Sequence, residues 1–325
     1  MRKQSVYITR RIPQIGIDIL AEEFDVEVQP EDRPLEREEF LTNIRGKDGV
    51  LCLITDRIDA EVFDRAPEVK GYANFAVGYD NIDVAEATKR GVPVSNTPDV
   101  LTDATAEMAW ALIFAIARRI PESDRLVRSG EWKGWGPLQL IGGDITGKTL
   151  GIVGAGRIGT AMAMKSRGFG MSVLYCDDFV NTRLEEELGA ERVFFDNLLD
   201  RADFVSLHVP LGPATSGLFG LEEFNKMKST AYLINTARGP IVREKDLVRA
   251  LEEGLIAGAG IDVYEKEPFV ETGLLELWNV VLTPHTASAT VSARSGMAEK
   301  AALNLRAMLR GERPRDCLNP VVFKN

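Results

Sequence analysis

The sequence contains very little histidine and cysteine, and this scarcity narrows the chemistry open to it. Its 325 residues include two histidines, His208 and His285, and three widely spaced cysteines. No Cys-x-x-Cys pair occurs, so the cysteines predict neither a disulfide framework nor a thiolate metal site. We therefore expect reduced thiols, a cytoplasmic location and no bound metal.

Long hydrophobic segments and blocks of basic residues are also missing. The longest apolar run, residues 108–117, is half of the roughly 20 residues that a membrane-spanning helix needs. The N-terminal stretch MRKQSVYITRRIP lacks the apolar segment of a secretory signal. The formal net charge is −10, and no Lys/Arg cluster is present. This composition argues against nucleic acid and anionic membranes as partners.

Two series of alternating strand-like and helix-like segments predict an α/β protein with two domains. The first series occupies the first hundred residues, and the second extends from about residue 149 to residue 285. Alternation of this kind predicts parallel sheets with helices on both faces, as in doubly wound Rossmann-like folds. The strand candidates of the first series are residues 5–9, 25–28, 49–55, 71–77 and 92–96.

Between the two series lies a segment bracketed by Pro98 and Pro121 that is apolar on nearly every side. It predicts a buried helix at a domain junction or a subunit interface. The glycine-rich residues 128–148 predict a loop, in which Trp132 and Trp135 need another surface to cover them. Residues 292–312 predict a final amphipathic helix, and the pattern alone does not assign it to either domain.

A G-x-G-x-x-G motif at Gly154, Gly156 and Gly159 lies between an apolar strand and a helix. Its glycines allow a tight turn, close approach to a pyrophosphate and close packing of the helix on the strand. The next strand ends at Asp177, where a carboxylate would accept hydrogen bonds from the adenosine ribose of NAD. A solvated strand end is the less favoured interpretation of Asp177.

Charge near this motif favours NAD over NADP. Asp178 doubles the negative charge that would repel a 2′-phosphate, and Arg183 lies close enough in sequence to weaken that repulsion. A glycine turn with a following acid also suits S-adenosylmethionine in a methyltransferase. The chemistry therefore has to be decided by residues outside this motif.

Three further strand ends carry Arg238, Glu267 and His285. Ligands of doubly wound sheets bind at the carboxyl ends of strands, so these side chains are expected to share one crevice. Arg238 suits a substrate carboxylate, and a carboxylate beside His285 would keep its imidazole protonated for proton transfer to a carbonyl oxygen. Glu265 competes with Glu267 for this position, and spacing does not choose between them.

Each residue also has an ordinary structural interpretation. Arg238 could pair with a surface carboxylate, and acidic residues such as Glu267 usually face water. Only the combination of three charged strand ends favours catalysis. His208 follows an apolar strand inside the nucleotide-binding half, where packing or contact with the cofactor is expected rather than catalysis.

Seven motifs together resemble D-isomer-specific 2-hydroxyacid dehydrogenases, most closely the glyoxylate/hydroxypyruvate reductase branch. They are AVGYDNID, TPDVLTDATAE, KTLGIVGAGRIG, LHVPL, INTARGPIV, GIDVYEKEP and TPHTASAT, and they span essentially the whole chain. The resemblance implies that Arg238 binds the carboxylate and keto group, that Glu267 rather than Glu265 is the paired acid, and that His285 is the acid/base.

The resemblance also implies the contacts with NAD(H) and substrate. Leu53, Val77 and Gly78 would bind substrate together with Arg238 and His285. The expected cofactor contacts are Thr105, Gly154, Gly156, Arg157, Ile158, Gly159, Asp177, His208, Pro210, Thr215, Thr236, Ala237 and Asp262.

The expected organisation is discontinuous. The resemblance implies a flavodoxin-like substrate domain of residues 1–98 and 290–325, with a dinucleotide-binding Rossmann domain of residues 99–289 inserted into it. The long helix after Pro98 would serve as hinge and homodimer interface. The loop with Trp135 and Gln139 would reach toward the partner subunit's active site.

Two functions from different classes are consistent with the sequence. The leading hypothesis is NADH-dependent reduction of small 2-keto acids, such as glyoxylate and hydroxypyruvate, to D-2-hydroxy acids. The alternative is an NADH-sensing binding protein similar to C-terminal-binding corepressors, which acts through protein partners with little turnover. The sequence does not rank the 2-keto acids, because one methylene in a pocket is worth only about 1–3 kcal/mol.

Overall fold

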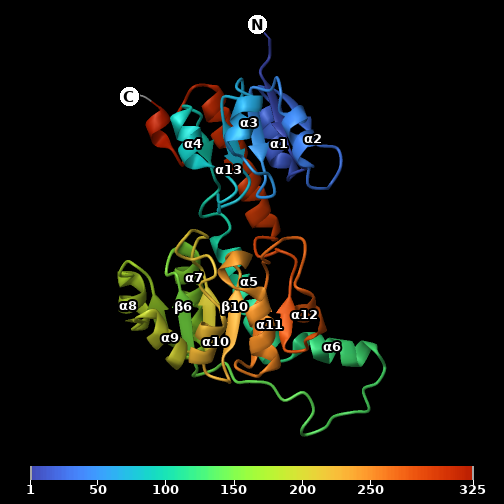
Figure 1. Cartoon of the computed structure of the whole chain (residues 1–325), viewed down its shortest axis with the longest axis vertical. Coiled ribbons are helices and arrows are strands. Elements are labelled where there is room, and N and C mark those ends of the chain that lie inside the picture. The colour runs from blue at the N-terminus through green and yellow to red at the C-terminus, as the bar shows by residue number, and fades with distance from the viewer. Residues whose placement is uncertain (1, 324–325) are drawn as a thin grey trace. The chain divides into compact units, whose positions relative to one another are not determined.

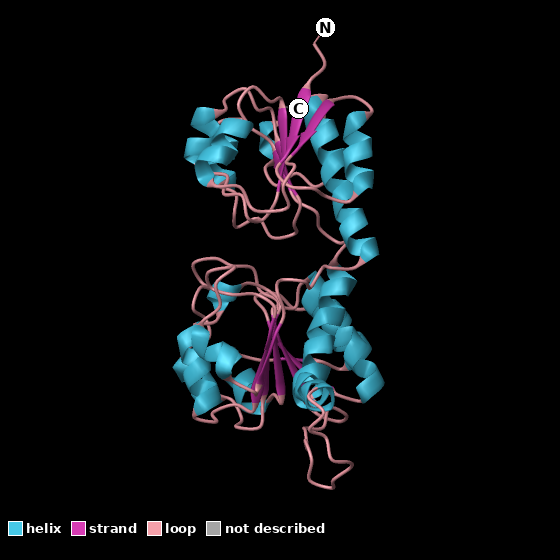
Figure 2. Ribbon diagram, turned by 90° about the vertical axis from the view of Figure 1, so that its right-hand side faces the viewer, coloured by secondary structure: helices cyan, strands magenta, loops and turns pink. Residues whose placement is uncertain are grey.

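The computed structural model describes residues 2–323 and divides the chain into two compact units. Unit 1 combines the residues up to Leu101 with those from Ala289 onward, and unit 2 is the continuous stretch Thr102–Ser288. Each unit has a sheet covered by helices on both faces, which Figure 2 shows with strands in magenta and helices in cyan. The expected doubly wound α/β fold class is confirmed.

The sheet of unit 1 is entirely parallel and has the order β2-β1-β3-β4-β5 within the described residues. Its central strands are apolar and buried, as expected for strands with helices on both sides. The strands are β1 (Ser5–Ile8), β2 (Asp25–Val28), β3 (Gly49–Cys52), β4 (Tyr72–Asn74) and β5 (Val94–Ser95).

The helices of unit 1 come from both ends of the chain. The last helix, α13 (Val291–Leu309), packs against α1 (Gln14–Ala21), and a Cβ on Gly16 would lie 2.8 Å from the carbonyl oxygen of Ala298. A side chain at residue 16 would therefore push these helices apart. The other helices are α2 (Arg37–Asn43), α3 (Ala60–Arg65), α4 (Val84–Lys89) and the 3-10 turn η3 (Pro320–Val322).

The sheet of unit 2 is also entirely parallel, in the order β12-β11-β10-β9-β6-β7-β8. The order reverses at β6, and such a reversal forms a crevice at the carboxyl ends of the strands. The strands are β6 (Thr149–Val153), β7 (Ser172–Cys176), β8 (Glu191–Arg192), β9 (Phe204–Leu207), β10 (Tyr232–Asn235), β11 (Gly258–Ile261) and β12 (Val280–Leu282).

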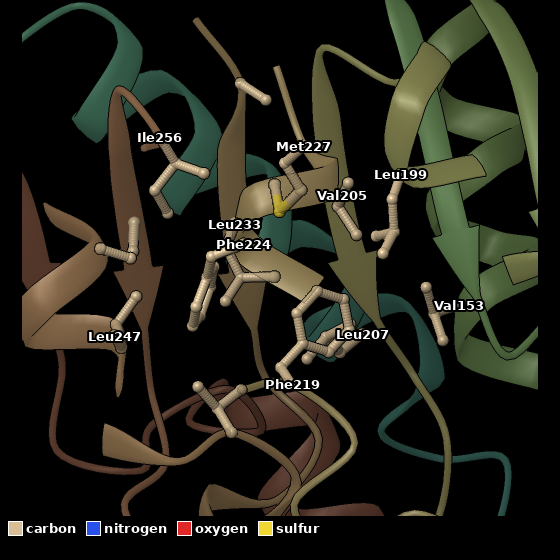
Figure 3. Close-up of a cluster of buried hydrophobic side chains, with 14 of the residues drawn as sticks. Val153, Leu199, Val205, Leu207, Phe219, Phe224, Met227, Leu233, Leu247 and Ile256 are labelled. Carbon is tan, nitrogen blue, oxygen red and sulfur yellow. The ribbon is translucent and has the colours of Figure 1, made fainter. Parts of the chain in front are cut away.

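Helices cover this sheet on both sides (Figure 1). One face carries a buried cluster in which Phe219 and Phe224 pack near Val205 and Leu207 of β9 (Figure 3). The helices of unit 2 are α5 (Thr102–Ala117), α6 (Ile120–Arg128), α7 (Arg157–Lys165), α8 (Thr182–Leu188), α9 (Phe195–Arg201), α10 (Leu221–Lys226), α11 (Glu244–Glu252) and α12 (Thr272–Glu276), with 3-10 turns η1 (Ser166–Phe169) and η2 (Gly239–Ile241).

The apolar segment between the two prolines is shorter than the sequence pattern suggests. Helix α5 ends at Ala117, and Arg119 adopts a left-handed backbone with φ of 52°. Pro121 lies in the first turn of α6 instead of ending α5. Proline is tolerated in the first turn of a helix because the N–H it lacks would be unsatisfied there. The loop after α6 extends away from the sheet of unit 2 (Figure 1), and Trp135 in it is 86% exposed.

Two further features concern residues 2–323 as a whole. No helix among them is long and apolar enough to cross a membrane. The three cysteines are free, and Cys52 is fully buried in unit 1. Burial raises the pKa of its thiol well above the ordinary value, so Cys52 is an unreactive part of the core.

Candidate active site

The glycine turn after β6 has the shape that a dinucleotide requires. Gly154 has φ of +93°, and a Cβ there would lie 2.8 Å from the carbonyl carbon of His208. A Cβ on Gly159 would lie 2.0 Å from the carbonyl oxygen of Gly154, whereas the space beside Gly156 is open. Gly156 directly precedes α7, so a phosphate can approach the N–H groups of its first turn. The expected neighbours Arg157 and Ile158 form that turn.

Asp177 follows β7 and holds the glycine turn as well as its own loop. Its carboxylate accepts hydrogen bonds from the N–H groups of Ala155 at 2.7 Å and Phe179 at 3.0 Å. Arg192 donates to the carbonyl oxygens of Asp177 and Asp178 at 2.8 and 2.7 Å. Arg183, the nearby cation expected from the sequence, pairs instead with Glu187 on α8. Arg192 was missed because it belongs to the next strand, β8.

The remaining expected cofactor residues of unit 2 occupy strand ends and one helix. Thr105 is buried in the first turn of α5, and the hydroxyl of Thr215 closes the turn after Pro210 by donating to its carbonyl at 2.6 Å. Thr236 and Ala237 follow β10. The hydroxyl of Thr236 is buried without a hydrogen-bond partner among the described residues, so a polar ligand group would satisfy it.

Arg238, Glu267 and His285 follow three adjacent strands, β10, β11 and β12. The Nδ1 atom of His285 lies 2.8 Å from Oε2 of Glu267, and both side chains remain about one-third exposed. The Nε2 atom of His285 has no partner among residues 2–323. The ring is thus fixed on one side by a carboxylate and open on the other.

The charges around Glu267 keep it ionised. Partial burial opposes ionisation, but the hydrogen bond and positive charge of His285, with smaller help from the Tyr264 N–H and Arg238, hold the pKa of Glu267 below its ordinary value. Arg238 is placed by Asn235, whose side chain donates to the Arg238 carbonyl at 2.9 Å. Together the three side chains form a group with a net positive charge when His285 is protonated, which suits an anionic substrate.

A buried carboxylate holds the loop that carries His285. Asp262 is fully buried, and its Oδ1 accepts from the Thr283 hydroxyl at 2.6 Å and the Thr286 N–H at 2.8 Å, while Oδ2 accepts from the Ala287 N–H at 2.8 Å. These bonds offset the cost of the left-handed backbone of His285, whose φ is 52°. Asp262 was expected to line the cofactor, and its observed contacts are with this loop.

A second buried carboxylate holds the loop that carries Glu267. Glu244 is 6% exposed and accepts hydrogen bonds from the N–H groups of Glu265 at 2.6 Å and Glu271 at 3.0 Å. Burial raises the pKa of Glu244, an effect that these two bonds oppose. Glu244 does not stand out in the sequence, because a glutamate at the start of a helix usually stabilises only that helix.

The second histidine has opposite surroundings. His208 follows β9, and burial lowers the pKa of its imidazole to about 3. Its Nε2 lies 2.9 Å from the hydroxyl of Ser206. His208 is therefore neutral at physiological pH, and it lies against the glycine turn through the contact of its backbone with Gly154.

The expected substrate residues outside the triad belong to unit 1. Leu53 follows β3, and Val77 and Gly78 follow the neighbouring strand β4. The backbone N–H of Leu53 donates to the buried carboxylate of Asp56 at 2.8 Å. All three residues are half-buried at the carboxyl ends of their strands.

Comparison with known proteins identifies the class. A sequence model of the D-isomer specific 2-hydroxyacid dehydrogenase NAD binding domain matches residues 110–287. A glyoxylate reductase of Thermococcus kodakarensis is 52% identical over 326 aligned positions, covering 99% of this chain and 98% of that protein. The chain therefore belongs to the D-isomer specific 2-hydroxyacid dehydrogenase family. Within the family it falls in the glyoxylate reductase branch.

Solved structures agree with this assignment. A crystal structure of a protein from Thermus thermophilus superposes with a TM-score of 0.91 and 42% identity, covering 97% of this chain and 100% of that one. An NADPH-dependent glyoxylate/hydroxypyruvate reductase of Sinorhizobium meliloti, in complex with NADP and malonate, gives a TM-score of 0.87 at 30% identity over 100% of this chain and 99% of that one. The chain is thus an oxidoreductase with a nicotinamide cofactor.

Proposed function

We propose that this chain reduces glyoxylate and similar small 2-keto acids, including hydroxypyruvate, to 2-hydroxy acids of D configuration. The observation that carries the proposal is the 2.8 Å pair of His285 Nδ1 and Glu267 Oε2, beside Arg238 at adjacent strand ends. A protonated imidazole with one free nitrogen next to an arginine suits a substrate that has both a carboxylate and a carbonyl oxygen.

The roles of the three side chains follow from their charges. The guanidinium of Arg238 binds the substrate carboxylate and polarises the keto oxygen. His285 donates its Nε2 proton to that oxygen as the carbonyl carbon is reduced, and Glu267 stabilises the imidazolium and fixes the ring. A bound nicotinamide supplies the hydride. In the reverse direction neutral His285 accepts the hydroxyl proton.

NADH is the proposed cofactor in preference to NADPH. Asp177 and Asp178 place two carboxylates after β7, where a 2′-phosphate would be repelled, and Arg192 is engaged by the backbone carbonyls of the same residues. The Sinorhizobium relative uses NADPH, so this preference is a property to be measured on this chain.

The cofactor preference is tested by Asp177→Ala. We expect weaker NADH binding and a fall of about tenfold in the ratio of kcat/KM for NADH to that for NADPH, the effect of losing a hydrogen bond to a charged group. Because Asp177 also accepts from the Ala155 N–H, Asp178→Ala is the matched control for charge alone. An unchanged ratio in Asp177→Ala would assign the ribose contact to another residue.

The chain is also proposed to form a homodimer through unit 2. Trp135 and Leu138 are 86% and 81% exposed, and Trp278 on the same unit is 59% exposed. A cavity of about 500 Å³ at the amino ends of the strands is lined by Arg119, Tyr232 and Trp278 among others. A second copy would cover these apolar surfaces.

The proposed homodimer is tested by analytical ultracentrifugation. The wild-type chain should sediment as a dimer, and Trp135→Ser should weaken the association of the two copies. A monomeric wild type would refute this assembly.

The reaction itself is tested by following absorbance at the nicotinamide band with NADH or NADPH and four acids in turn: glyoxylate, hydroxypyruvate, pyruvate and phenylpyruvate. Rapid loss of NADH with the small acids is the expected result, and the series gives the size limit of the pocket. Binding of NADH without turnover of any acid would refute the proposal and favour a cofactor-sensing protein.

A further inference from the structure

The backbone carbonyl groups of the segment that follows β4 in unit 1 are held by hydrogen bonds. Three successive carbonyl oxygens accept hydrogen bonds: that of Ala76 from the Thr97 N–H at 2.9 Å, that of Val77 from Nδ2 of Asn96 at 2.7 Å, and that of Gly78 from Nδ2 of Asn74 at 2.9 Å. Two of the three donors are side-chain amides, so side-chain identity sets the orientation of this backbone.

Planar trans peptides then fix the direction of the N–H groups. In such a peptide the N–H points away from the carbonyl of the preceding residue. The N–H groups of Val77, Gly78 and Tyr79 are therefore directed away from the donors that hold the carbonyls. None of these three N–H groups has a hydrogen-bond partner among residues 2–323, and consecutive unpartnered N–H groups form a site for an anion.

The two amides are well placed to preset this arrangement because they are buried. Asn74 is fully buried and Asn96 is 7% exposed. Burying an amide is costly unless its hydrogen bonds are satisfied, so both side chains are held to the carbonyls they contact. An aspartate in either place would repel the carbonyl and add a negative charge beside the anion site.

The same network extends to the neighbouring loop that carries Leu53. Asn81 lies 3.2 Å from Asn74 through their side-chain amides and donates to the carbonyl oxygens of Leu53 at 3.1 Å and Asp56 at 3.0 Å. The loops after β3 and β4 are thus cross-linked by amides. A shift in one loop would displace the other.

We propose that Asn96 and Asn74 are positioning residues, which preset the N–H groups of Val77 and Gly78 to bind the substrate carboxylate. The identity of the anion rests on the function proposed above. Neither asparagine contacts the reacting atoms in this assignment. Their loss should therefore weaken substrate binding while leaving the chemical step largely intact.

The test compares Asn96→Leu with Asn319→Leu. Leucine keeps the side-chain volume and removes the donor. Asn319 is a matched control because it is 4% exposed in the same unit, and its amide joins Val92 and Val94 away from the anion site. In Asn96→Leu we expect KM for glyoxylate and the dissociation constant of oxalate, measured by calorimetry on the NADH-bound protein, to rise together by about tenfold.

The controls separate positioning from loss of stability. We expect kcat within about threefold of the wild type and unchanged NADH affinity in Asn96→Leu, since a positioning residue affects binding rather than chemistry. Asn319→Leu should lower the melting temperature without changing KM. If Asn96→Leu does not fold, Asn96→Ser, with a shorter donor, takes its place with the same expected direction.

Other results of these measurements would refute either the positioning role or the proposed reaction. Unchanged KM and oxalate affinity in the Asn96 variant would overturn the inference, as would a collapse of kcat at constant KM. Wild-type protein that binds oxalate but turns over no 2-keto acid would refute the proposed reaction and leave the anion site standing. Equal rises in KM for both asparagine variants would show a general structural effect and refute positioning.

Discussion

His208 follows β9 and His285 follows β12 of the same parallel sheet, yet the two imidazoles have opposite surroundings. Burial lowers the pKa of His208 to about 3, and its partner is the neutral hydroxyl of Ser206 at 2.9 Å. His285 is 30% exposed, and its partner is the carboxylate of Glu267 at 2.8 Å. One ring is kept neutral and the other is supplied with a counter-charge.

The difference between the two histidines shows that a position at the end of a strand is not enough to make an imidazole a proton donor or acceptor. Both side chains are at carboxyl ends of strands, where a ligand of this fold binds. Only His285 has a carboxylate partner whose own loop is fixed, by Glu244 through the Glu265 and Glu271 N–H groups. The ability to transfer a proton therefore comes from the neighbouring loops.

The largest expected effect follows from removing the ring of His285. His285→Ala should lower kcat about 10³-fold, the typical worth of a general acid, with NADH affinity within about twofold of the wild type. Steady-state absorbance measures the first quantity and fluorescence titration the second. Activity within tenfold of the wild type would mean that another group supplies the proton.

The second effect follows from removing the counter-charge. Glu267→Gln should lower kcat about 10²-fold, because the imidazolium involved in proton transfer loses its stabilising charge and the ring loses its partner. The lowered pKa of Glu267 keeps this carboxylate ionised at neutral pH. Glu265→Gln, two residues away, is the matched control and should leave kcat close to the wild-type value. Equal losses in both variants would argue against specific pairing.

The smallest effect on turnover is expected at His208. His208→Gln should keep kcat within about threefold and preserve the pH profile, since His208 is neutral across it. Stability should differ instead. Unfolded His208 takes up a proton below about pH 6.5, whereas the folded ring does so only near its lowered pKa of about 3, so wild-type stability falls as the pH drops through this window.

The size of that stability loss is at most about 1.4 kcal/mol per pH unit. Denaturant unfolding of the wild type and His208→Gln at several pH values between 7 and 4 measures it. The variant should lose less stability on acidification. Parallel curves for the two proteins would contradict the lowered pKa of His208.

Much of the fold could be predicted from the sequence because its signals are local. Strand-helix alternation, the turn at Gly154 and the three charged strand ends are each read from a few adjacent residues. The end of α5 was less predictable, since Pro121 is compatible with ending one helix or beginning the next.

The residues that support the site could not be found in this way. Glu244 contacts Glu265 and Glu271 across 21 and 27 residues, and Asn96 contacts Val77 across 19. Neither residue belongs to a pattern with local periodicity. Their roles depend on which loops the sheet brings side by side, so only the three-dimensional arrangement reveals them.

The interrupted construction of unit 1 has a consequence for synthesis on the ribosome. Its sheet is made first, but α1 packs through Gly16 on α13, which is made after the whole of unit 2. Unit 2 is one uninterrupted stretch and has all its strands once β12 has emerged. Domains tend to fold as units during translation. Unit 2, which carries the pair of His285 and Glu267, can therefore complete its fold before α13 has been synthesised and can pack on α1.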